Sequence, residues 1–505
     1  MQRILNLSFC ASSMPEGYGR WTVKPRHWVP NESTMLQEPI GKDRSLADLL
    51  AYYYIRYYRI GPFYGEIFNL GTLTSKPYGT YITYTGKNRH LGNLPITRQF
   101  GRAVVIDLQV GEREAVTETK LKEAASAKIK KGDIVILRTN YSACRPQQPS
   151  QKYFEDSPVL SFEAAAWLVG QNIKMVTTDM RSIESYGENS VHSLFNTAGI
   201  PVVEDLANLS LIKTSSVYLM VGAPLPIFGA PGGPVRVIAF EDINDLQKPL
   251  DLTHPLYTYP EPESNSPYAW ELPIPDRIEP REYHGDAAKW QRMTPFQVVQ
   301  SGKVIGQEAY FTYSHGSTTH VEGPYLDPLG EYGTSDEILR RYKRMPFDRL
   351  VGPAALIDLR EYVGARQLVH VQHLKKKAAH VREGDIAFIR TGFNDWYLYG
   401  GGGGETTPGL TPEAAEWLAE RKIRALAFDM PSIERSEPLS TVGQIRFTSN
   451  ENHYIMHNAD IPVVDWGINF SFLRKDRFIA AILALPAVNQ PSAVPAQLIA
   501  IENWD

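Results

Sequence analysis

Two histidines and a glutamate stand close together in the segment 314–324, SHGSTTHVEGP, which closes on glycine and proline. His315, His320 and Glu322 offer imidazole nitrogens and carboxylate oxygens, the donor atoms that zinc and manganese accept in enzymes. A catalytic site for such an ion needs at least three protein ligands and an open position. The segment therefore predicts either a metal-binding loop or the remnant of one.

A second arrangement pairs a histidine with a carboxylate twelve residues later, and it occurs twice. His192 precedes Glu204 and His453 precedes Asp465, since 204 − 192 and 465 − 453 both equal 12. A carboxylate can fix the tautomer of an imidazole while the ring moves a proton, so each pair can perform acid–base catalysis without a metal. A single such histidine is equally well explained as a hydrogen-bonded interior residue. Its recurrence with a carboxylate at the same distance favours the catalytic interpretation.

The recurrence belongs to an internal duplication. KGDIVILRT at 131–139 returns as EGDIAFIRT at 383–391, and LSFEAAAWL at 160–168 returns as LTPEAAEWL at 410–418. Three further pairs keep the same order: VIDL and LIDL (105–108, 356–359), TDMRSIE and FDMPSIE (178–184, 428–434), and GIPVVE and DIPVVD (199–204, 460–465). Collinear blocks of this kind indicate a duplicated domain of about 200 residues.

Each copy has the pattern of an α/β domain. Short apolar runs at 133–137 and 174–178 predict buried strands, and the runs at 235–240 and 496–501 predict a last strand in each copy. The intervening EAAAWL and EAAEWLAE segments predict helices, with Ser161 and Thr411 as N-caps and Pro412 in the first turn. We expect an N-terminal extension at 1–60, a first domain at 61–245, a proline-rich linker at 246–290 and a second domain at 291–505.

The composition excludes several classes of protein. A chain of 505 residues is too long for one hydrophobic core, and 43% hydrophobic with 21% charged residues is typical of a globular protein. A net charge of -4 gives no electrostatic attraction to nucleic acid or to an anionic membrane. No run reaches the roughly 18 apolar residues of a membrane span, and two cysteines are typical of a reducing compartment. We expect a cytoplasmic protein that acts on a small molecule.

The duplicated domain, with a His-x-Glu-x-Pro segment early and an Ile-Pro-Val-Val-Asp segment late, resembles the cyclase family, which includes kynurenine formamidase and isatin hydrolase. The signature of that family is His-x-Gly-Thr-His-x-Asp-x-Pro-x-His, followed by a late histidine and by a glutamate twelve residues on. The resemblance covers both copies. It implies tandem swivelling β/β/α domains, one or two divalent ions, usually zinc or manganese, and acid–base catalysis by the last signature histidine.

The second copy matches this signature in part. His320 fits the second histidine, Glu322 stands at the aspartate and Pro324 at the proline. The first histidine is displaced to His315, and Leu326 stands where the acid–base histidine belongs. With the late pair the second copy offers enough ligands for one zinc or manganese ion, with His320 and Glu322 as the early ligands. The displaced ligand and the missing histidine nevertheless favour chemistry without a metal.

The first copy keeps less of the signature. It retains the late residues His192 and Glu204, but Tyr81 and Thr83 occupy the early ligand positions. Two ligands are too few for a catalytic divalent ion, so no metal is expected there. Tyr81 is interpreted either as a proton donor or as a space-filling residue.

We therefore expect a diverged enzyme that forms or modifies a ring in a carbonyl-rich small molecule, by cyclisation, dehydration or lactone chemistry in natural-product metabolism. The pairs His453–Asp465 and His192–Glu204 are the expected acid–base groups. A metal-dependent hydrolase of amides or lactones, of the kynurenine formamidase type, is the alternative, and a binding protein with decayed catalytic centres is a third possibility. Fused copies can form a pseudo-dimer within one chain, so a monomer suffices and a homo-oligomer stays open.

Overall fold

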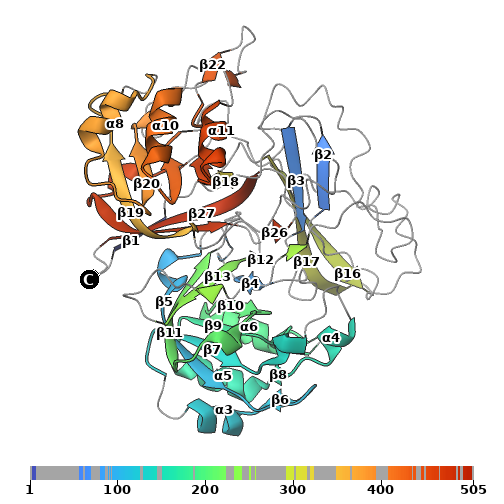
Figure 1. Ribbon diagram of the computed structural model, residues 1–505. Coiled ribbons are helices and arrows are strands. Elements are labelled where there is room, and N and C mark those ends of the chain that lie inside the picture. Colours follow the sequence, from blue (N-terminus) through green and yellow to red (C-terminus); the bar gives the residue numbers. More distant parts are fainter. Residues whose placement is uncertain are drawn as a thin grey trace.

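The computed structural model places two α/β units one above the other, with further strands beside them (Figure 1). It describes residues 3–6, 56–60, 63–69, 80–241, 250–257, 292–322 and 349–502, with gaps at 86–88, 90, 92–93, 126–128, 145–150, 186–187, 223–231, 252–255, 301–302, 315–318, 364–366, 394–407, 431, 435, 439–444, 448–450, 466, 485–486 and 489–492. Each unit contains one large mixed sheet. The duplication inferred from the sequence is thus confirmed as two domains of the same class.

The first unit is built on a nine-stranded sheet of order β12-β4-β10-β9-β7-β5-β11-β13-β14. The central strands β5, β7, β9 and β10 run parallel, and the strands on either side of them are antiparallel. In chain order the strands are β4 (Tyr81–Thr83), β5 (Phe100–Asp107), β7 (Ile134–Arg138), β9 (Met175–Thr178), β10 (Val202–Glu204), β11 (Ser216–Gly222), β12 (Gly232–Pro234), β13 (Arg236–Phe240) and β14 (Leu250–Asp251).

The second unit repeats this order in an eight-stranded sheet, β1-β27-β18-β24-β21-β20-β19-β25. Its long strand β27 pairs with both β18 and β25, which curls the sheet on itself. The strands are β1 (Arg3–Asn6), β18 (His320–Glu322), β19 (Val351–Asp358), β20 (Ile386–Arg390), β21 (Ala425–Phe428), β24 (Val463–Asp465), β25 (Arg477–Ala484) and β27 (Ala493–Glu502). The repeated blocks of the sequence thus fall on equivalent strands of the two sheets.

Smaller sheets join segments outside these two. The strands β2 (Arg56–Ile60), β3 (Phe63–Asn69), β16 (Arg292–Gln300) and β17 (Lys303–Ser314) form one sheet of order β16-β17-β3-β2. Three two-stranded pairs complete the described strands: β6 (Ala115–Val116) with β8 (Val159–Leu160), β15 (Leu256–Tyr257) with β26 (Ala487–Val488), and β22 (Ser436–Pro438) with β23 (Ile445–Phe447).

The principal helices begin where the sequence predicts. Ser161 accepts a hydrogen bond from the backbone N–H of Ala164 at 3.2 Å at the start of α5 (Phe162–Gly170), and Thr411 does the same for α10 (Pro412–Glu420). Pro412 is the first helical residue, where its missing N–H costs nothing. The other helices are α3 (Glu118–Ala125), α4 (Gln151–Glu155), α6 (Ser190–Ala198), α8 (Val371–Lys377) and α11 (Glu451–Asn458), with 3-10 turns η2 (Ile96–Arg98), η3 (Tyr141–Cys144), η4 (Leu209–Leu211) and η9 (Phe470–Phe472). None of the helices in the described part of the chain has the length and apolarity needed to cross a membrane.

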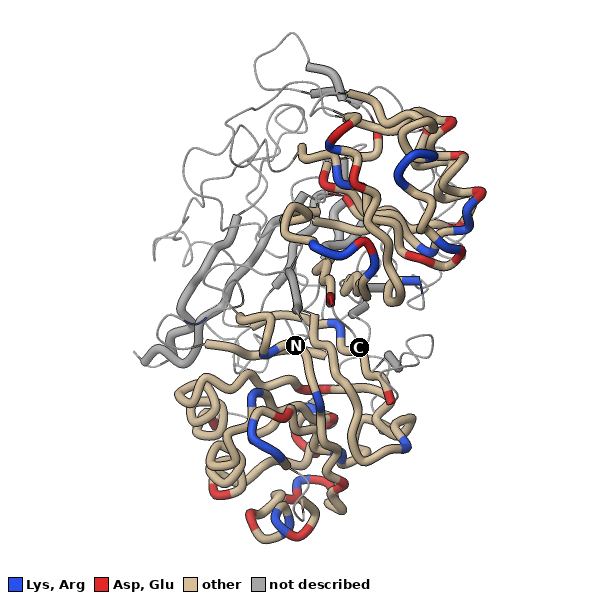
Figure 2. The backbone as a smooth tube through the Cα atoms, turned by 90° about the vertical axis from the view of Figure 1, so that its left-hand side faces the viewer, with Lys and Arg blue, Asp and Glu red and all other residues tan. Residues whose placement is uncertain are grey.

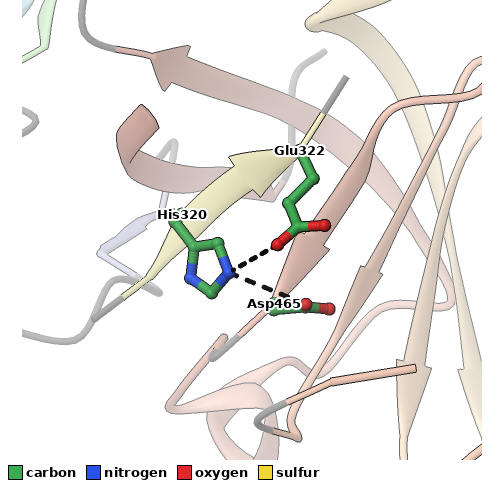
Figure 3. Close-up of side chains that lie close together, drawn as sticks. All are labelled: His320, Glu322 and Asp465. Atoms are coloured by element: carbon green, nitrogen blue, oxygen red, sulfur yellow. Dashed lines mark ion pairs between the residues drawn. The ribbon is translucent and has the colours of Figure 1, made fainter. Parts of the chain in front are cut away.

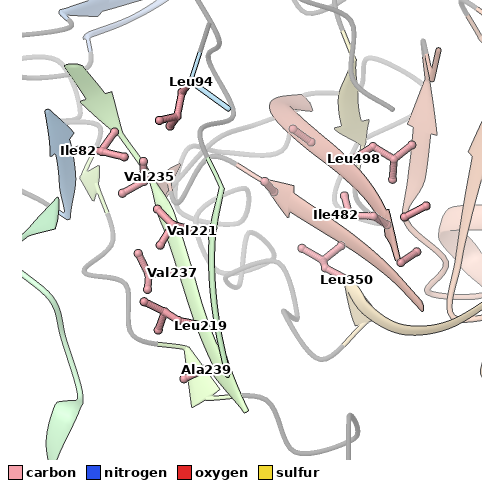
Figure 4. Close-up of a cluster of buried hydrophobic side chains, with 14 of the residues drawn as sticks. Ile82, Leu94, Leu219, Val221, Val235, Val237, Ala239, Leu350, Ile482 and Leu498 are labelled. Carbon is pink, nitrogen blue, oxygen red and sulfur yellow. The ribbon is translucent and has the colours of Figure 1, made fainter. Parts of the chain in front are cut away.

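The two sheets face each other, and the helices lie on their outer faces (Figure 1). One buried cluster joins side chains of both units, among them Leu219 and Val237 from the first and Ile482 and Leu498 from the second (Figure 4). Charged residues gather mainly on the outer, helical parts of the units (Figure 2). This distribution follows from the apolar faces that each sheet buries against the other.

Candidate metal centre and its counterpart in the first copy

Strand β18 and strand β24 bring three candidate ligands together. Side chains two residues apart on a strand point to the same face, so His320 and Glu322 share one side while Val321 enters the core between the sheets. His320 is directly opposite Asp465 in the antiparallel register of the two strands. A three-residue strand is thus enough to align ligands that are far apart in the sequence.

These three side chains form a compact cluster, shown in Figure 3. His320 Nε2 lies 3.3 Å from Glu322 Oε1 and 3.7 Å from Asp465 Oδ2, and one donor atom from each residue lies within 4.8 Å of the others. His320 and Asp465 are buried and Glu322 is 12% exposed. The predicted ligands of the second copy are therefore neighbours in space.

His453 approaches the same carboxylates from helix α11. Its Nε2 lies 3.2 Å from Glu322 Oε2 and 3.7 Å from Asp465 Oδ2, so each carboxylate stands between two imidazoles. On its other side, His453 Nδ1 lies 3.2 Å from Oε1 of Glu434. Because the Nδ1–H of His453 donates a hydrogen bond to Glu434, Nε2 is the nitrogen that His453 presents to the cluster.

Buried charge controls the protonation of this group. Burial opposes a charge on His453, but Glu322, Asp465 and Glu434 outweigh it and hold its pKa well above the ordinary value. Burial also opposes a charge on Glu322, yet His453 and His320 hold the pKa of this carboxyl well below its usual range. Burial raises the pKa of Asp465. In the metal-free protein a proton on His453 therefore balances part of the negative charge.

The donor set fits a divalent cation. Three buried or nearly buried carboxylates face two imidazoles, so a net charge of −1 remains even if both rings are protonated, since −3 + 2 = −1. Within the described residues, Asp465 Oδ1 is buried and has no hydrogen-bond partner. An uncompensated buried carboxylate oxygen is costly, and a cation satisfies it. His320, Glu322, His453 and Asp465 are the side chains able to hold that ion.

The first copy repeats the framework without the early ligands. His192 on α6 contacts Glu184 through Nδ1 and lies 3.2 Å from Glu204 Oε1 through Nε2, so both ring nitrogens face carboxylates. Glu204 also accepts a hydrogen bond from the backbone of Ile183 at 2.7 Å. Burial opposes ionisation of Glu184, but its bond to His192 lowers the pKa of this carboxyl. The predicted pair His192–Glu204 thus exists, closed on its other side by a second glutamate.

Tyr81 occupies the position of His320 in this copy. Tyr81 is opposite Glu204 just as His320 is opposite Asp465, and Thr83 occupies the position of Glu322. The Tyr81 side chain is 1% exposed, and a Cβ added to Gly232 would lie 2.6 Å from its hydroxyl oxygen. Glycine on the neighbouring strand makes room for the ring and its hydroxyl, which is compatible both with a proton donor and with a space-filling residue.

Sequence reasoning missed two acidic residues. Glu184 and Glu434 end the repeated Asp-Met-x-Ser-Ile-Glu block, and each contacts the histidine of its copy. Their recurrence in the block was the available signal. His315, Pro324 and Leu326, the other signature positions, lie outside the described residues.

The chain matches the Cyclase family, described as "Putative cyclase", over residues 13–185 and 250–435. The protein therefore belongs to the Cyclase family and carries two copies of its domain, with the signature of the early segment altered in both. A comparison with curated proteins gives no match.

Three solved structures of similar proteins each match less than half of this chain. Isatin hydrolase A from Ralstonia solanacearum is 18% identical, with a TM-score of 0.31 over 42% of this chain and 82% of its own. Isatin hydrolase A from Labrenzia aggregata is 18% identical, with a TM-score of 0.30 over 48% and 94%. A predicted metal-dependent hydrolase from Bacillus stearothermophilus is 17% identical, with a TM-score of 0.30 over 42% and 88%.

Proposed function

We propose that the second copy binds one divalent cation and adds water to, or removes water from, a carbonyl group of a small molecule, so that an amide or lactone is opened or formed. The observation that supports this function is the cluster of His320, Glu322 and Asp465, whose donor atoms lie within 4.8 Å of one another. His453 supplies a fourth donor beside them. The second copy thus offers enough ligands, while His315 and Leu326, the two departures from the signature that favour metal-free chemistry, lie outside the described residues.

The bound ion, Glu434 and His453 have separate roles in this proposal. When bound, a zinc or manganese ion would supply the Lewis acidity that polarises a carbonyl oxygen and makes a water molecule more acidic. Glu434 holds the Nδ1–H of His453 and so keeps Nε2 directed at the site. His453 and the two carboxylates can bind a cation only when the imidazole is deprotonated, so cation binding releases the proton that its raised pKa retains.

The reaction proposed is hydrolysis of a cyclic or open amide, or of a lactone. The oxygen of water bonds to the carbonyl carbon, the bond from that carbon to nitrogen or to the ester oxygen breaks, and a proton passes to the leaving atom. The added water supplies this proton, so the side chains that hold the cation do not have to carry it. No oxidant or further reactant is needed.

Ring formation is the second candidate: a cyclisation or dehydration of the substrate by a route other than the reverse of this hydrolysis, so that no activated water is needed. The observation in its favour is Leu326, which stands where the family's acid–base histidine belongs. A site without that histidine is less suited to activating water for hydrolysis. Cyclisation or dehydration of a carbonyl-rich substrate in natural-product metabolism fits this change.

We also propose that the first copy has no metal and that a monomer contains one complete site. His192 lies between two carboxylates, but Tyr81 and Thr83 occupy the positions at which His320 and Glu322 provide the early ligands in the second copy. No residue of another chain is needed to complete the cluster.

Metal analysis of the purified protein tests the proposal. After incubation with zinc or manganese and removal of excess ion, we expect one equivalent per chain, and its loss in His320→Ala and Glu322→Gln together with turnover. His192→Ala, the matched change in the first copy, keeps the metal. Isatin, N-formylkynurenine and a simple γ-lactone serve as substrates for opening, and the corresponding open acids for closure. Full turnover by a metal-free protein, or full metal content in folded His320→Ala, contradicts it.

A further inference from the structure

His457 is a buried polar residue that the metal cluster does not use. It lies one turn after His453 on helix α11, and the two ring centroids are 5.8 Å apart at an interplanar angle of 64°. Its side chain is buried, and neither ring nitrogen has a hydrogen-bond partner among the described residues. Buried polar groups are nearly always hydrogen-bonded, because an unmade hydrogen bond is costly.

The first copy has a polar residue at this position with a hydrogen-bond partner inside the fold. The equivalent residue is Asn196, since 457 − 196 equals 453 − 192. Its side-chain oxygen accepts a hydrogen bond from the backbone N–H of Thr85, two residues beyond strand β4, at 3.4 Å. Asn196 therefore ties helix α6 to the chain that follows the site strand.

The sequence of the second copy excludes a counterpart of that bond. The position equivalent to Thr85 is Pro324, because 324 − 85 equals 320 − 81, and proline has no N–H to donate. A histidine in place of asparagine is thus not explained by the packing role seen in the first copy. A neutral imidazole carries one donor and one acceptor, which suits a polar group without charge.

We propose that His457 contacts the substrate in the second copy, where its ring nitrogens hydrogen-bond to an uncharged polar group such as a carbonyl, amide or hydroxyl. This inference rests on the proposed function, since it places the substrate against His453 and the carboxylates. It also accounts for a buried polar side chain that the fold itself leaves without a partner among the described residues. Substrate-binding residues commonly reduce the stability of the free protein in this way.

A stability comparison tests the inference without any substrate. In His457→Leu, an apolar side chain replaces a group with no bond to lose, so the Tm of the free protein is expected to stay the same or rise. The control is Asn452→Leu on the same helix, because the Asn452 amide donates to Leu410 O at 2.9 Å and to Glu434 Oε2 at 3.0 Å, and its Tm is expected to fall. A fall of similar size in His457→Leu means that the ring has a partner within the protein and overturns the inference.

A kinetic comparison with isatin, a small cyclic amide, tests the substrate contact itself. In His457→Leu, which offers no hydrogen-bonding group, we expect the metal content to be unchanged and KM to rise about tenfold, the effect of one lost hydrogen bond of about 1.4 kcal/mol. An unchanged KM in an enzyme that opens isatin overturns the inference. If the wild type turns over none of the proposed substrates, the proposed function fails, while the Tm comparison still decides whether His457 is bonded inside the protein.

Discussion

Glu434 serves both a helix and the candidate site. Its Oε1 accepts a hydrogen bond from the backbone N–H of His453 at 3.0 Å, in the first turn of α11, and the same oxygen faces Nδ1 of that residue. A carboxylate is favourable at a helix N-terminus, where backbone N–H groups lack partners. The contact that fixes the helix therefore also fixes the orientation of the imidazole.

The change Glu434→Gln separates these two roles. Glutamine can still accept the backbone hydrogen bond, but it removes a negative charge that helps to raise the pKa of His453. We expect this pKa to fall toward its ordinary value in the metal-free protein, measured by NMR titration, and the metal Kd to rise about 10- to 100-fold. Because the pKa of His453 is higher in the folded than in the unfolded protein, its protonation stabilises the fold at pH values below the pKa of the unfolded protein. This stabilisation is lost as the pH rises through the pKa of the folded protein, and it is smaller in the variant.

Glu184→Gln is the matched control in the first copy. Glu184 contacts His192 as Glu434 contacts His453, and it accepts hydrogen bonds from Val191 and His192. We expect its effect on stability to be similar and the metal Kd to be unchanged. If Glu434→Gln binds metal as tightly as the wild type, the orienting role of Glu434 is wrong.

At the scale of the elements, strand register explains how two strand positions account for the difference in early ligands between the two copies. Strands β4 and β18 pair with β10 and β24 in the same register, so Tyr81 and His320 occupy one position and Thr83 and Glu322 another. A strand presents residues two apart on one face, and two substitutions there are enough to add or remove two ligands.

The double variant Tyr81→His with Thr83→Glu is therefore expected to create a second metal site. Both side chains would join His192 and Glu204 on the pattern of the second copy, and the metal content measured by elemental analysis should rise from one to two equivalents per chain. Tyr81→Phe, the control, keeps one equivalent and full turnover, because the ring fills space against Gly232. A folded double variant that still binds one equivalent refutes the equivalence of the two strands.

The sequence predicts the elements well and the contacts between them less well. Capping by Ser161 and Thr411 and the buried strands depend on local residue types, and the structure confirms them. The approach of Glu434 to His453 depends instead on how a turn and a helix pack, which no local pattern specifies. His457 was overlooked because a polar residue on a helix is ordinarily exposed, although its spacing of four from His453 places both on one face.

At the scale of the whole molecule, the two sheets approach so closely that one position tolerates no side chain. A Cβ added to Gly222 on strand β11 would lie 2.3 Å from Cβ of Leu483 on strand β25. Nearby, Arg236 Nε donates to the carbonyl of Ala484 at 3.1 Å across the same boundary. The duplicated domains therefore share a packed interior rather than sitting as two independent bodies.

Gly222→Ala is expected to destabilise the protein by about 1–3 kcal/mol, because overpacking a close-packed interior forces its neighbours apart. Gly170→Ala is the control, since a Cβ there meets nothing within 4 Å. Adding Leu483→Gly to Gly222→Ala should cost less than the sum of the two single changes in urea unfolding, because it removes Cβ of Leu483, the atom that the new Cβ would meet. If the losses in the free energy of unfolding are additive, or if Gly222→Ala is as stable as the Gly170→Ala control, strands β11 and β25 do not pack closely at Gly222. The two copies would then be held together by their other contacts.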